Sequence, residues 1–244
     1  MFTFKNIIML LLPLFIIVAC SSNNNGDHDK TIMETTPEIQ MPVRGTWELV
    51  NSPGHDRYEF DMVALDDSSL RRMNISRTRH FISRVNVENF YGWSKPVYAP
   101  IDGKIIKASD GWKDRKQLNM IKDIFSMFIS NNRLDPADIR PVAGNYVIME
   151  KNGYYLFLAH LQEGSIQVSE GDTVYTGEMI GRVGNSGLSL YPHLHIQFFD
   201  QIDDFSKATA PPFRIARFKQ RTGEDWKLVK NSEFKKGEII KFNY

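Results

Sequence analysis

Apolar and polar residues alternate in short runs over most of the chain from about residue 41 to residue 205. Successive side chains of a β-strand point to opposite faces, so this two-residue period predicts strands with one buried face. Turn signals separate the runs, among them Asp102-Gly103 and Asn152-Gly153, which favour tight hairpins. The pattern predicts a mainly β, antiparallel domain with strands at residues 46–50, 58–63, 96–99, 103–108, 145–150, 154–160, 173–175, 179–183 and 193–199.

One segment within this domain has a helical period. Over residues 117–130, apolar side chains recur at the spacing of one helix face, at Met120, Ile121, Ile124, Phe125 and Phe128. This predicts one amphipathic α-helix within an insertion of about residues 112–141. The following residues 206–244 are rich in charges, and we expect a C-terminal extension packed on the domain.

The beginning of the chain reads as an export signal. Lys5 precedes an uncharged run over residues 7–19, which is shorter than the about 20 apolar residues of a membrane span and fits a signal peptide. The run ends at Ala19-Cys20, which resembles a bacterial lipobox with an acylated cysteine. We therefore expect removal of residues 1–19, a lipid anchor at Cys20, a flexible tether over residues 20–40, and export to the cell envelope.

Charge and cysteine content exclude several classes of function. Without residues 1–19, which contain Lys5 and no acid, the chain has 29 basic and 29 acidic residues. A net charge of zero gives no indication of a nucleic-acid partner. Cys20 is the only cysteine, so disulfides within the chain and a thiol nucleophile are both excluded. Nothing in the sequence indicates the oligomeric state.

The candidate chemistry lies on one predicted strand near residue 195. His193, His195 and Gln197 alternate with apolar residues, so their side chains share one face of this strand. Two such imidazoles can bind one metal ion, or one can bind it while the other acts on a substrate. His160 ends another apolar strand, and taken alone this position favours a structural residue.

A set of motifs in a fixed order resembles the lysostaphin/LytM-type zinc endopeptidases. The motifs are 97–103 (VYAPIDG), 159–161 (AHL), 168–181 (VSEGDTVYTGEMIG), 184–187 (GNSG) and 192–195 (PHLH). The resemblance implies a small antiparallel barrel-like sandwich, the duplicated hybrid motif. It also implies a zinc site in which His195 is a ligand and His160 and His193 form the catalytic pair.

The remaining zinc ligands are where this chain departs from that family. The family carries His-x-x-x-Asp upstream, whereas the best match here is His55 with Asp61, at a spacing of six rather than four. Asp61 lies in an apolar strand, where an unpaired charge is unfavourable and a bound cation would account for it. The alternative pair, His80 with Glu88, stays open at this point.

The resemblance implies a Zn²⁺-dependent endopeptidase that hydrolyses peptide bonds in the stem peptides or cross-bridges of peptidoglycan. Two histidines and one carboxylate with an open fourth position are typical of a catalytic zinc. The alternative is a catalytically inactive family member that binds the cell wall or regulates another hydrolase. The chain has no His-Glu-x-x-His motif and no Gly-x-Ser-x-Gly motif, which excludes two other common hydrolase sites.

Overall fold

The structure is a computed structural model that describes residues 36–50, 52, 55–130, 138–205 and 207–243. The chain divides into two compact units, Met1–Thr35 and Thr36–Tyr244, and every described residue belongs to the second. The expected signal peptide, Cys20 and most of the expected tether therefore lie outside the described residues. Within the described part of the chain, no helix combines the length and the apolar character that crossing a bilayer requires.

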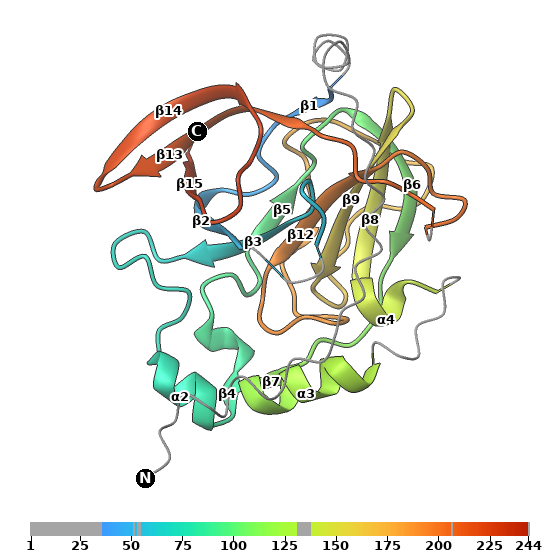
Figure 1. Cartoon of the computed structure of the whole chain (residues 1–244). Helices are drawn as coiled ribbons and strands as arrows, with labels where there is room; N and C mark the ends of the chain where they lie inside the picture. Colours follow the sequence, from blue (N-terminus) through green and yellow to red (C-terminus); the bar gives the residue numbers. More distant parts are fainter. Residues whose placement is uncertain (1–35, 51, 53–54, 131–137, 206, 244) are drawn as a thin grey trace, which may run out of the picture. The chain divides into compact units, whose positions relative to one another are not determined.

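The fold is mainly β and largely antiparallel, as the sequence predicts (Figure 1). One sheet of eleven strands has the order β1-β13-β15-β2-β3-β12-β9-β8-β6-β10, with β14 paired to β13. In chain order these strands are β1 (Glu38–Ile39), β2 (Gly45–Val50), β3 (Phe60–Leu65), β6 (Gly103–Ser109), β8 (Asn145–Lys151), β9 (Tyr154–Leu161), β10 (Thr173–Val174), β12 (Leu194–Phe199), β13 (Arg214–Thr222), β14 (Asp225–Ser232) and β15 (Ile239–Phe242). A smaller pair, β5 (Pro96–Tyr98) and β11 (Met179–Arg182), is also antiparallel.

Alternation along the strands produces the core. In β2, Trp47 and Leu49 are fully buried, and in β12 the apolar residues Leu194, Ile196 and Phe198 join the same cluster. The opposite face of β12 carries His195 and Gln197, which are also buried. β12 is therefore covered on both faces, with an apolar core on one side and polar chemistry on the other.

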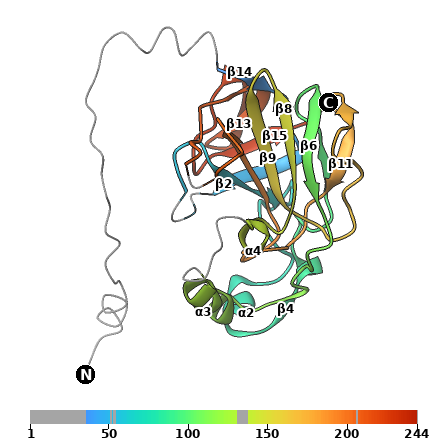
Figure 2. The same ribbon diagram turned by 90° about the vertical axis from the view of Figure 1, so that its right-hand side faces the viewer.

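Short helices form a separate group of elements. In chain order this group contains α2 (Arg77–Ile82), β4 (Val85–Asn86), a 3-10 turn at Val87–Asn89, β7 (Gln117–Leu118) and α3 (Met120–Ser130). The helix α3 confirms the helix predicted from the sequence. These elements enclose a small second core of Met73, Val85, Val87, Phe90 and Leu118. α4 (Arg140–Ala143) then leads into β8. In both views α2 and α3 lie at the end of the domain opposite β14 (Figure 1, Figure 2).

The C-terminal strands are integrated in the main sheet. β13 and β15 pair with each other, β15 pairs with β2, and β1 pairs in parallel with β13. The described part of the expected tether, residues 36–40, thus includes a strand, and Ile39 is buried in the main core. The expectation of a flexible tether is therefore wrong for these residues. Local composition could not predict the strand, because its partner β13 lies about 175 residues further along the chain.

Candidate metal centre

Three neighbouring strands bring the predicted site residues together. β12 lies between β3 and β9, so that His195 is the strand partner of Asp61 on one side and of Ala159 on the other. His160 follows Ala159 directly, and His193 precedes the first residue of β12. The ring of His160 consequently lies 4.5 Å from that of His193 and 6.1 Å from that of His195, measured between centroids.

Asp61 is the centre of the cluster. Its Oδ1 lies 2.9 Å from Nδ1 of His195 and 3.3 Å from Nε2 of His193, while its Oδ2 accepts a hydrogen bond from the Ser52 hydroxyl. Burial alone would raise the pKa of this carboxyl. The neighbouring imidazoles of His193 and His195 outweigh burial and hold the pKa of Asp61 well below its usual range. Asp61 is therefore a carboxylate near neutral pH.

His55 approaches from the loop that precedes β3. Its Nδ1 lies 3.8 Å from Oδ2 of Asp61, and its ring meets that of His195 edge to face at 5.0 Å. This Nδ1 is buried and has no hydrogen-bond partner among the described residues. Burial is the largest cause that lowers the pKa of His55 to about 4, against the opposing charge of Asp61. His55 is thus neutral near pH 7, and its ring nitrogens are available to bind a cation.

The ring of His195 is oriented by a series of side-chain hydrogen bonds through Gln197 to Glu59. Its Nε2 lies 2.6 Å from Oε1 of Gln197, and the amide nitrogen of Gln197 donates in turn to Glu59 at 3.4 Å. An amide oxygen accepts hydrogen bonds and cannot donate them, so Nε2 carries the proton and Nδ1 faces Asp61. Burial lowers the pKa of His195, but the hydrogen bond and charge of Asp61 dominate and raise it above its ordinary value.

His160 and His193 are held through their Nδ1 atoms. Nδ1 of His160 donates to the carbonyl of Ser186 at 2.9 Å, and Nδ1 of His193 donates to the carbonyl of Tyr191 at 2.8 Å. Burial, followed by the neighbouring imidazoles, lowers the pKa of His160 well below its ordinary value. His160 is therefore a neutral base with an unprotonated Nε2. Its backbone φ of +60° is uncommon for a residue other than glycine.

The loop that holds His160 was not found by sequence reasoning. The Ser186 hydroxyl donates to the carbonyl of Leu161 and accepts from the backbone of Asn145, so it ties this loop to β8 and β9. Gly187 allows this loop to lie directly against the backbone before β8, because a Cβ at residue 187 would lie 2.3 Å from the backbone nitrogen of Gly144. The Gly184-Asn185-Ser186-Gly187 motif was the available signal, but its partner in β8 is about forty residues away in sequence.

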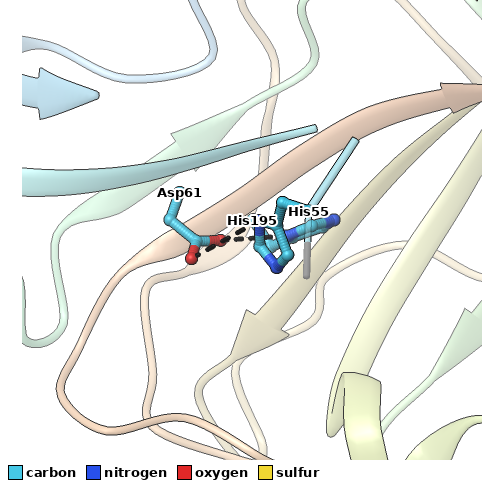
Figure 3. A group of neighbouring side chains, drawn as sticks. All are labelled: His55, Asp61 and His195. Carbon is cyan, nitrogen blue, oxygen red and sulfur yellow. Dashed lines mark hydrogen bonds and ion pairs between the residues drawn. The ribbon is translucent and has the colours of Figure 1, made fainter. Parts of the chain in front are cut away.

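The donor set fits a divalent cation. Among the described residues, the group of three metal-binding side chains is His55, Asp61 and His195, whose ligand atoms lie within 4.8 Å of one another (Figure 3). Nδ1 of His195 points at a carboxylate oxygen although the proton of a neutral ring is on Nε2. Such a lone pair facing a carboxylate requires either an added proton or a cation between the two groups. The buried Nδ1 of His55, which has no hydrogen-bond partner among the described residues, is the second observation that fits a cation at this position.

His80 and Glu88, the alternative pair, are not part of this group. His80 is buried in α2 and packs edge to face on Phe90, with ring centroids 5.1 Å apart. It thus belongs to the second core of the helical elements. Burial there lowers its pKa below the ordinary histidine value, which is the behaviour of a packed neutral ring.

Residues 88–206 match the family model described as Peptidase family M23, which supports this family for that segment of the chain. The matched segment contains His160, His193 and His195, whereas His55 and Asp61 lie before it. No curated protein matches the chain in sequence.

Similar solved structures include the catalytic domain of lysostaphin from Staphylococcus simulans, at 19% identity, 76% coverage of this chain and 96% of that chain, with a TM-score of 0.35. A candidate M23 peptidase from Pseudomonas aeruginosa is 18% identical, with 66% of this chain and 44% of that chain covered and a TM-score of 0.36. A zinc-containing peptidase from Vibrio cholerae is 20% identical, with 63% and 45% covered and a TM-score of 0.31. The chain spans less than half of the length of the last two.

Proposed function

We propose that this chain is a zinc-dependent endopeptidase that hydrolyses peptide bonds in the stem peptides or cross-bridges of peptidoglycan. The observation that carries the proposal is the convergence of His55, Asp61 and His195 beside a second pair of histidines. The match of residues 88–206 to the M23 peptidase family supports the same reaction class.

In this proposal His55, Asp61 and His195 hold the zinc ion. Two imidazole nitrogens and one carboxylate oxygen are a ligand set found in catalytic zinc sites, which keep one position open. When bound, zinc acidifies a water molecule and polarises the scissile carbonyl. Gln197 fixes the ring of His195 by accepting a hydrogen bond from Nε2–H, so that Nδ1 is the atom presented to the ion.

His160 and His193 handle the protons. His160 is neutral, and its protonated Nδ1 is occupied by the Ser186 carbonyl, so its Nε2 can take a proton from the attacking water and deliver it to the leaving amine. His193, whose Nδ1 is held by the carbonyl of Tyr191, would stabilise the developing oxyanion. Their ring centroids lie 4.5 Å apart with the ring planes tilted by 50°, which would allow both histidines to act on one carbonyl group.

Metal analysis and wall digestion together test this function. The purified protein should contain one zinc per chain and solubilise peptidoglycan, and His195→Ala should lose both properties. Ser189→Ala, which alters a neighbour of His193 without removing a ligand, is the matched control and should keep its zinc. A parent protein that contains zinc but releases no peptide from walls of several cross-link types would point instead to an inactive wall-binding or regulatory protein. A parent without zinc would refute the metal site.

We further propose export and lipid anchoring through Cys20, based on the lipobox-like sequence at the end of the uncharged run. More than one acyl chain at this residue would give a stable membrane anchor. Mass spectrometry of protein purified from cells tests this directly. An unprocessed N-terminus, or processing that leaves Cys20 without lipid, would refute the proposal.

A further inference from the structure

The loop that carries His55 joins β2 to β3. Among its described residues, the backbone hydrogen bonds are long, at 3.3 Å from His55 to Ser52 and 3.3 Å from Glu59 to Asp56. The spacing of six between His55 and Asp61 also makes this loop longer than the four-residue spacing of the resembled family. A longer loop has more conformations to lose when its histidine is held at one point.

The C-terminal segment supports this loop. Between β14 and β15, the ammonium group of Lys236 donates hydrogen bonds to the carbonyl of His55 at 3.1 Å and to that of Asp56 at 2.7 Å. Lys236 is half-buried, and its two acceptors belong to the candidate ligand and to the residue that follows it. A single cation thus fixes two successive peptide groups of the loop, and bonds with a charged donor are stronger than neutral ones.

Neighbouring residues of this segment hold the rest of the loop. Phe234 is buried and meets Phe60, the residue before Asp61, edge to face at 5.5 Å. Glu233 forms an ion pair with Arg57 at 3.7 Å, although this pair is largely exposed and contributes little. Within four residues the segment therefore reaches three points along the stretch from His55 to Phe60.

The start of the loop is held by the same segment. The backbone of Leu49 in β2 accepts from Gly237 at 2.6 Å and donates to Glu238 at 2.9 Å. These bonds extend the pairing of β15 with β2 to Leu49, one residue before the end of β2. Both ends and the middle of the loop are consequently attached to residues 233–242.

We propose that residues 233–242 are a structural part of the metal centre, with Lys236 as the positioning residue for His55. The inference rests on the proposed zinc site. It assigns a function to a segment outside the residues that match the peptidase family, and it explains how an irregular ligand spacing can still produce a preorganised site.

The test compares zinc affinity in Lys236→Met with that in the parent, using the full chain in detergent and a competing chelator. Methionine keeps the length of the apolar stem but removes the charge and the donors. We expect zinc to bind about tenfold more weakly, the lower end of the effect of losing a group that orients a ligand. Lys236→Arg should restore most of the affinity, and Lys235→Met, which changes the exposed neighbouring lysine, should leave it unchanged.

Thermal unfolding separates positioning from general stability. If Lys236 positions His55, the increase in melting temperature on adding zinc should shrink in Lys236→Met and return in Lys236→Arg. An equal decrease in melting temperature with and without zinc, at unchanged zinc affinity, would overturn the inference. A parent protein that binds no zinc would refute the proposed function instead, so the two failures can be distinguished.

Discussion

Replacing His55 with glutamine should change how the stability of the metal-free protein depends on pH. The pKa of His55 falls from its ordinary value of 6.5 to about 4 in the folded protein, chiefly because of burial. Between these two values the unfolded chain binds more protons at this residue than the folded chain does. Stability should therefore decrease as the pH is lowered from 6.5 toward 4, and lowering the pH further should add nothing at this residue.

The magnitude follows from the difference between the two pKa values. One pH unit corresponds to about 1.4 kcal/mol, so the full effect of His55 is about 3 kcal/mol at most. The side chain is 24% exposed, which reduces the effect somewhat but leaves it well above the error of a denaturation experiment. Glutamine does not titrate, so His55→Gln should lack this contribution, whereas the other buried groups titrate in both proteins.

Urea denaturation at a series of pH values between 7 and 4, with a chelator present, measures the difference directly. The free energy of unfolding of the parent should decrease by about 2–3 kcal/mol more than that of His55→Gln over this range. Parallel curves for the two proteins would refute the reasoning, because they would mean that His55 is protonated as readily in the fold as in water.

Two further predictions concern the histidine pair and its support. His160→Asn, which tolerates the left-handed backbone at this position, should keep one zinc per chain but lower kcat by roughly 10²–10⁴-fold, as expected for loss of a general base; unchanged kcat would exclude His160 from proton transfer. Gly187→Ala should destabilise the protein by more than about 3 kcal/mol, because the added Cβ meets backbone atoms at 2.3–2.4 Å. Gly223→Ala is its control, since that glycine also has positive φ but open space around it, and should cost only about 1 kcal/mol; equal losses in calorimetry would contradict the packing argument.

Much of the fold was predictable because its signals are local. Alternation and turn dipeptides gave strands such as β2, β8 and β9 close to their observed bounds, and the helical period gave α3. Asp61 could be chosen because a carboxylate between Phe60 and Met62 requires a partner. The two-residue spacing of His193 and His195 was sufficient to place them on one face of a strand.

The support of the site was not predictable, because it depends on pairing between distant segments. Lys236 contacts a loop about 180 residues away, and the charge-rich composition of its segment gives no indication of this contact. Ser186 reaches Asn145 across about forty residues. Such partners follow from the order of strands in the sheet, which no local period encodes.

The strand order also has a consequence for folding. β15 pairs with β2, which lies about 190 residues earlier in the chain. Until β15 joins the sheet, one edge of β2 has no partner and Lys236 cannot hold the loop that carries His55. Contacts between such distant segments form slowly, so this loop should be among the last parts of the domain to reach its final conformation.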